Sequence, residues 1–78
     1  MILERLKTIV DEHLIYEGDL TPETRMVEDL GADSFDIPLL IDAAEQEFNV
    51  LISDQELLKI RTIGDLISLI NKNEEAGG

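Results

Sequence analysis

The residues with the greatest chemical potential in this chain form the segment 28–36, which reads Glu-Asp-Leu-Gly-Ala-Asp-Ser-Phe-Asp. It places Ser34 between Asp33 and Asp36, directly before an apolar helical pattern. A serine that acts as a nucleophile needs a neighbouring base and an oxyanion hole. The single histidine, His13, lies far earlier in the chain, and no Gly-x-Ser-x-Gly elbow is present. We therefore expect that Ser34 catalyses no reaction and is modified by another enzyme.

Other catalytic and metal-binding patterns are also missing from the sequence. Without cysteine there is no disulfide framework and no thiolate metal site, which fits a reducing cytoplasm. Asp29, Asp33 and Asp36 do not follow the ligand spacing of an EF-hand loop. A glycine-rich phosphate loop is absent as well. We predict that the protein is not an enzyme and has no metal site.

The acidic residues are concentrated in the middle of the chain. The net charge is −12, and no basic residue lies between Arg25 and Lys59. This segment would repel nucleic acid and anionic lipid and attract a protein with a basic patch. An acidic surface that only maintains solubility is the alternative interpretation. No stretch has the apolar length of a membrane span, so we expect a cytoplasmic protein with neither nucleic-acid nor membrane partners.

The periodicity of apolar residues predicts helices separated by polar turns. We expect a first helix at about residues 2–15, a long connection at 16–33 and a second helix at 34–48. Ser53-Asp-Gln-Glu56 reads as a capping box that opens a short helix, and Thr62-Ile-Gly-Asp65 opens a last helix that ends near Asn71. The fold class is therefore all-α, with four helices, one of them short, and a long first loop. We expect one domain at 1–72 and a flexible tail at 73–78.

The start of the second helix is expected to be irregular. Asp33 is a natural N-cap, and the negative charge of Asp36 would interact favourably with the positive N-terminal end of the helix. Pro38 has no N–H to donate to the carbonyl of Ser34, and it disfavours helical angles at Ile37. We therefore predict either a loose turn around Ser34 or a regular helix that begins near Asp36. The loop before it should be held against the helices by Leu20, Met26, Val27 and Leu30.

Several motifs in the same order resemble those of acyl carrier proteins. Segment 29–36 is similar to the family's Asp-Leu-Gly-x-Asp-Ser-Leu-Asp signature, and segment 45–48 to its Glu-Glu-Phe ending of the second helix. Segments 53–56 and 62–66 resemble the openings of its third and fourth helices. The resemblance covers most of the chain and implies an acyl-carrier-like four-helix bundle.

The resemblance also implies a cofactor and partners. Ser34 would be the attachment site for 4′-phosphopantetheine from coenzyme A, with Asp33 and Asp36 helping to dock the transferase. Acyl groups would then be carried as thioesters for fatty-acid or related lipid or polyketide synthesis. The partners would be a holo-synthase and acyl transferases and ketosynthases with basic patches, and the carrier itself would be a monomer. The docking residues expected on the second helix are Asp36, Leu39, Asp42, Glu45 and Glu47.

An acyl chain would be sheltered by apolar residues between the second and third helices. The expected lining is Leu40, Ala44, Phe48, Leu57, Ile60 and Ile63. For any single one of these residues, plain core packing is the favoured interpretation.

The chain departs from the family pattern near the serine. Phe35 replaces the usual leucine, and Pro38 stands where an ordinary helix former is normal. Leu39 stands where the family commonly has an exposed glutamate, and Asp42 where it commonly has an exposed methionine. These two changes on the docking face suggest a carrier specialised for particular partners. A peptidyl or D-alanyl carrier, which shares the fold and the serine, and an unmodified acidic interaction module are the alternatives.

Overall fold

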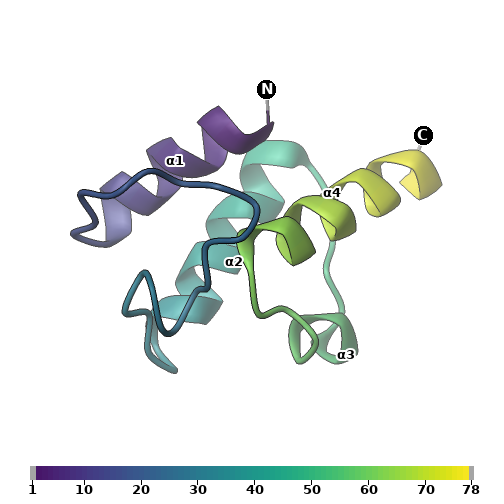
Figure 1. The fold of residues 1–78 in the computed structure, drawn as a ribbon. Coiled ribbons are helices and arrows are strands. Elements are labelled where there is room, and N and C mark those ends of the chain that lie inside the picture. Colours follow the sequence, from purple (N-terminus) through teal and green to yellow (C-terminus); the bar gives the residue numbers. More distant parts are fainter. Residues whose placement is uncertain (1, 78) are drawn as a thin grey trace.

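The computed structural model describes residues 2–77 and the side chains of residues 2–74. Within that range the chain forms four helices, α1 (Ile2–His13), α2 (Asp36–Phe48), α3 (Asp54–Leu57) and α4 (Ile63–Gly77), arranged as a bundle (Figure 1). The described residues contain no strand, and Arg25 and Thr62 form an isolated antiparallel bridge. The predicted all-α fold with one short helix and a long first loop is confirmed.

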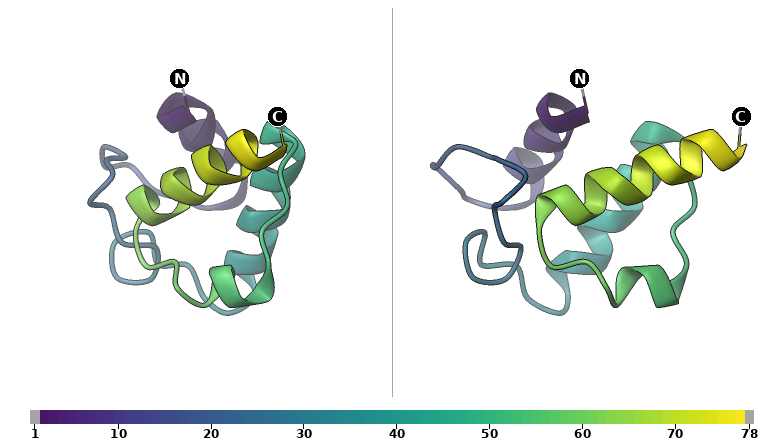
Figure 2. Two further views of the ribbon diagram at one scale, coloured as in Figure 1. Left: turned by 90° about the vertical axis from the view of Figure 1, so that its right-hand side faces the viewer. Right: turned by 45° about the vertical axis from the view of Figure 1, so that its right-hand side comes forward.

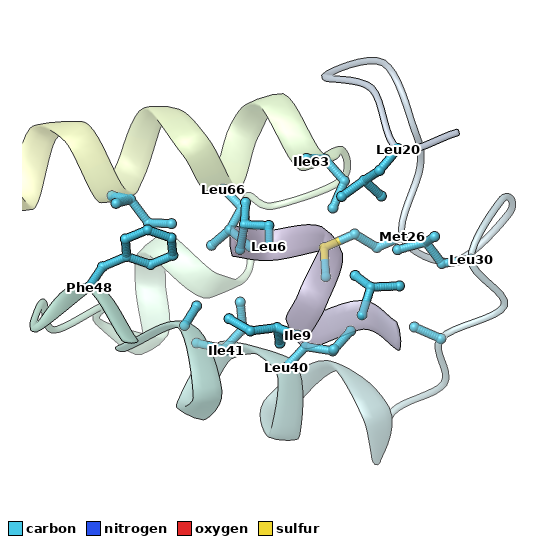
Figure 3. Close-up of a cluster of buried hydrophobic side chains, with 14 of the residues drawn as sticks. Leu6, Ile9, Leu20, Met26, Leu30, Leu40, Ile41, Phe48, Ile63 and Leu66 are labelled. Carbon is cyan, nitrogen blue, oxygen red and sulfur yellow. The ribbon is translucent and has the colours of Figure 1, made fainter. Parts of the chain in front are cut away.

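The core lies between α1, α2 and α4, and the loop between α1 and α2 closes it on one side (Figure 3). Each of these helices contributes residues spaced three or four apart, as an amphipathic helix requires. The buried residues of the three helices are Leu6, Ile9 and Val10 in α1, Leu40, Ile41, Ala44 and Phe48 in α2, and Ile63, Leu66 and Ile70 in α4.

The loop between α1 and α2 is attached to the start of α4. The N–H of Met26 donates to the carbonyl of Arg61 at 2.9 Å, and the N–H of Ile63 donates to the carbonyl of Thr24 at 2.9 Å. Both views in Figure 2 show this loop passing beside the first turn of α4. These bonds give buried backbone groups of the loop their partners and attach the loop to the segment before α4.

Apolar side chains also anchor the loop, with one difference from the prediction. Leu20, Met26 and Leu30 are buried, as expected, and Met26 and Leu30 reach from the loop into the core (Figure 3). Val27 is 56% exposed, so its predicted anchoring role is wrong. Residues 26–30 form a turn in which the N–H of Gly31 donates to the Val27 carbonyl. In this turn Met26 and Leu30, four residues apart, are buried, and the three residues between them are exposed.

The regular part of α2 begins at Asp36, two residues after Ser34. Pro38 is then the third residue of the helix, in the first turn, where a missing N–H costs little. The predicted late start is confirmed. Phe35, rather than Asp33, occupies the N-cap position and makes no side-chain cap hydrogen bond. Asp33 instead closes the turn immediately before the helix.

Capping boxes begin the two C-terminal helices. Ser53 and Glu56 exchange side-chain and backbone hydrogen bonds at the start of α3, as the sequence predicted. At α4 the N–H of Asp65 donates to the Thr62 hydroxyl at 3.1 Å, and the N–H of Thr62 donates back to the Asp65 carboxylate at 3.1 Å. These bonds satisfy donors that the helix itself leaves free.

We predict that the carboxylate of Asp65 makes a pH-dependent contribution to the stability of the fold. The N–H groups of Arg61 and then Thr62 donate to it and lower the pKa of Asp65. Because the pKa is lowered in the folded state, this carboxylate stabilises the fold above the ordinary aspartate pKa. The contribution is lost as the pH falls through the lowered value. We expect the wild type to melt above Asp65→Asn at neutral pH and this difference to disappear in acid, in circular dichroism melts from about pH 7 to about pH 2.

The control for this prediction is Asp42→Asn, which removes one exposed carboxylate without touching a helix start. A melting difference for Asp65→Asn that is unchanged at the lowest pH would contradict the assignment.

Two helix ends differ from the expected bounds. The first helix ends at His13 instead of residue 15, and α4 continues to Gly77 instead of ending near Asn71. Helical residues therefore extend into the 73–78 segment, and Gly78 lies outside the described residues. Flexibility of this segment stays a prediction. Among the described residues, no helix combines the length and apolar character needed to cross a membrane.

Candidate functional site

Ser34 lies in the turn that leads into α2, with its side chain exposed. The N–H of Ile37 donates to the carbonyl of Asp33 at 3.1 Å, so the turn has helical spacing although the regular helix starts later. Among the described residues, no hydrogen bond engages the Ser34 hydroxyl. Hence this hydroxyl is free to react with a group that another protein delivers.

The two aspartates around Ser34 fix the shape of the turn. One carboxylate oxygen of Asp33 accepts from the N–H of Phe35 at 2.9 Å and from the N–H of Asp36 at 3.0 Å. Asp36 returns a bond by accepting from the N–H of Asp33 at 3.2 Å. Donation from Asp36 first, and from Phe35 second, lowers the pKa of Asp33. The carboxylate that precedes the serine is therefore held in its charged form.

Of the expected docking residues on α2, Leu39, Asp42 and Glu47 are exposed. Leu39 is 53% exposed and Asp42 is exposed, whereas Asp36 is half-buried and engaged with Asp33. Phe35 is 78% exposed and lies one helical turn before Leu39. The surface next to Ser34 is therefore more apolar than the run of acids suggested.

The two glutamates expected on the docking face already have partners within the fold. Glu45 is half-buried and accepts from the N–H of Ile52 at 2.8 Å. Glu47 forms an ion pair with Arg5 at 2.8 Å, and the Arg5 guanidinium lies 4.3 Å from the centre of the Phe48 ring. Glu47 thus connects α2 to α1, and Glu45 connects α2 to the segment that follows α2. Their predicted docking role stays a prediction.

The structure divides the expected acyl lining into two groups. Leu40, Ala44, Phe48 and Ile63 are buried core residues, and Leu57 and Ile60 are half-buried at its edge. Only the last two can face a ligand without a rearrangement of the core.

A cavity of about 440 Å³ lies beside the start of α2 and includes one of these residues, Ile60. Its walls come from the loop at 25–28, from the segment 58–61, and from Ile37, one turn after Ser34. A serine-linked arm would therefore have an open surface on one side and this cavity nearby. The chain itself contains no thiol, so the arm would supply a function that the sequence lacks.

Three residues near the serine were not predicted from the sequence to belong to a site. Phe35, Leu58 and Arg61 surround the start of α2 or line the adjacent cavity, and Leu58 is 83% exposed. The departure of Phe35 from the family leucine was the only sequence signal for this group. Leu58 and Arg61 carried no comparable signal, because their place depends on the packing of the segment 58–61 against the loop.

Comparison with known proteins agrees with this geometry. Residues 4–70 match the family model described as a phosphopantetheine attachment site. The chain is 42% identical over 72 residues to an acyl carrier protein of Thermotoga maritima, covering 91% of this chain and 89% of the relative. The chain belongs to the acyl carrier protein family. A Mycobacterium tuberculosis structure assigned to the acyl carrier proteins has the same fold, with a TM-score of 0.81 at 29% identity, covering 87% of this chain and 92% of that one.

Membership in the acyl carrier protein family fixes the function and the cofactor. The protein carries acyl groups on covalently bound 4′-phosphopantetheine, and it interacts with enzymes that load or use this arm. When bound, the cofactor supplies the thiol that forms the thioester. The protein supplies the attachment point, the surface for its partners and the surroundings of the cargo.

Proposed function

We propose that Ser34 is the residue that carries the 4′-phosphopantetheine arm. One observation carries the proposal: an exposed, unengaged hydroxyl lies in a turn whose shape is fixed by two aspartates. During loading, a bond would form between Ser34 Oγ and the β-phosphorus of coenzyme A, and the pyrophosphate bond would break. Adenosine 3′,5′-bisphosphate would leave, and a base of the transferase would take the hydroxyl proton.

Asp33 and Asp36 would contribute in different ways. Asp33 holds the turn and presents negative charge to the transferase and the metal ion that accompanies coenzyme A. Asp36 is half-buried and bonded to the backbone of Asp33, so its main effect would be to keep the serine turn rigid. The chain holds the cargo and supplies no catalytic group of its own.

Partner enzymes would dock over the start of α2. Phe35 and Leu39 provide exposed apolar surface there, and Asp42 provides charge. Basic patches on acyl transferases and ketosynthases would be attracted by the surrounding negative field. Such attraction raises association rates more than affinity, which suits a monomeric carrier that exchanges partners in the cytoplasm.

The proposal is tested by the intact mass of the protein after incubation with coenzyme A and a phosphopantetheinyl transferase. We expect a mass gain of one arm per chain. Digestion and fragmentation of the product should place this gain on the peptide that contains Ser34. An unmodified interaction module would show no gain, and a gain on another peptide would also contradict the proposal.

The class of cargo can be read from carrier isolated from its source cells. Acyl groups on the arm support the acyl carrier function, whereas aminoacyl or D-alanyl groups would indicate the related carriers that share the fold and the serine.

A further inference from the structure

The cavity beside α2 combines an apolar surface with two arginines. Its volume is about 440 Å³, within the range of small-molecule sites. The hydrogen bond between the Met26 N–H and the Arg61 carbonyl joins the two segments that form its walls. The apolar lining residues are Met26, Val27, Ile37, Leu58 and Ile60, and the charged ones are Arg25, Glu28 and Arg61.

Two arginines on one cavity are unexpected in a chain with a net charge of −12 and only six lysine and arginine residues. Arg61 forms no side-chain ion pair within 4.0 Å among the described residues, and only its backbone N–H binds Asp65. Arg25 has long contacts, at 3.5 Å to Glu28 and 3.7 Å to Asp29. The Arg61 guanidinium is therefore available to a ligand, whereas Arg25 would exchange its long contacts with Glu28 and Asp29 for the ligand.

We propose that this cavity receives the far end of an acyl group that carries a terminal carboxylate. The inference rests on the proposed attachment of the arm at Ser34, which would bring the cargo to the cavity past Ile37. Guanidinium groups bind carboxylates through two parallel hydrogen bonds. The apolar lining would contact the methylene chain between the thioester and the carboxylate. A plain alkyl group of the same length would lack the carboxylate that pairs with the guanidinium groups.

Glu28 adjusts the strength of this site. Its carboxylate lies on the same cavity and competes for Arg25. The cavity lining itself carries two positive charges and one negative charge, and Asp29 lies beside Arg25 outside the lining. Removal of the Glu28 charge should therefore strengthen the binding of a carboxylated cargo.

The test compares two cargoes of equal length on the intact protein. A phosphopantetheinyl transferase loads the chain from adipyl-coenzyme A or from hexanoyl-coenzyme A. Cleavage of each thioester by hydroxylamine is measured and divided by the rate for the same free acyl-coenzyme A. We expect the adipyl group to be protected about threefold more than the hexanoyl group, the size of effect that exposed charge contacts give.

Variants assign the effect to the cavity. Arg61→Ala and Arg61→Gln should lower adipyl protection to the hexanoyl level, and Glu28→Gln should raise it. Lys59→Ala is the matched control, because Lys59 is a nearby exposed cation outside the cavity lining. It should leave the adipyl preference intact.

The possible failures are distinguishable. If neither cargo is loaded, the proposed attachment at Ser34 is wrong. If both are loaded and equally protected, or if the arginine variants keep the adipyl preference, the carboxylate site is wrong while the carrier function stands.

Discussion

Met26→Ala is expected to lower the free energy of unfolding by about 2–4 kcal/mol, the range for a buried Met or Leu replaced by alanine. Met26 is 2% exposed and belongs to the buried core cluster, so the substitution removes a buried side chain. The bonds from its N–H to the Arg61 carbonyl and from the Ala32 N–H to its own carbonyl are backbone bonds, which alanine keeps. Small domains have limited stability, so this loss is a large share of the total. Urea unfolding followed by circular dichroism measures it.

The adjacent residue provides a matched control for the Met26 prediction. Val27 belongs to the same turn but is 56% exposed, so Val27→Ala should change the free energy of unfolding by less than about 0.5 kcal/mol. Equal effects of the two substitutions would show that the loop is not anchored through Met26.

Asp33→Ala is expected to slow the loading of Ser34 by at least about tenfold, the factor that follows from the loss of hydrogen bonds to a charged group. The substitution removes the acceptor of the Phe35 and Asp36 N–H groups, and it removes the charge next to the serine. The measurement is the initial rate of arm transfer from coenzyme A at saturating transferase.

Asp33→Asn separates the two roles of this residue. Asparagine keeps an oxygen acceptor for the turn but has no charge, so its loading rate should lie between those of the wild type and Asp33→Ala. Asp42→Ala removes an exposed acid of the same helix outside the serine turn and should have a smaller effect. If Asp33→Ala is loaded as fast as the wild type, Asp33 has no part in presenting the serine.

The sequence was most informative where local chemistry decides the structure. Pro38 predicted that α2 begins late, because one missing N–H acts within one turn. The Ser53–Glu56 capping box predicted the start of α3 for the same reason. The motifs around Ser34 also identified the family, since they combine a turn, an N-terminal helix charge and an exposed hydroxyl within eight residues.

Features that depend on contacts between distant segments could not be predicted. Nothing in the sequence shows that Glu45 and Glu47 have partners within the protein. The fold brings the Ile52 N–H to Glu45 and the Arg5 guanidinium to Glu47. Val27 is apolar and was therefore expected to pack against the helices, but the turn that buries Met26 leaves Val27 exposed. The cavity between residues 25–28 and 58–61 lies where an isolated bridge joins segments that are far apart in the sequence.

The identity of the modified serine is the central claim, and the chain offers its own controls. Its three serines, Ser34, Ser53 and Ser68, are all exposed, so accessibility alone does not distinguish them. The decisive measurement is the intact mass of the wild type and of the three Ser→Ala variants after incubation with coenzyme A and a phosphopantetheinyl transferase. We predict that the wild type, Ser53→Ala and Ser68→Ala each gain one phosphopantetheine arm and that Ser34→Ala gains none. A Ser34→Ala protein that still gains the arm would contradict this account.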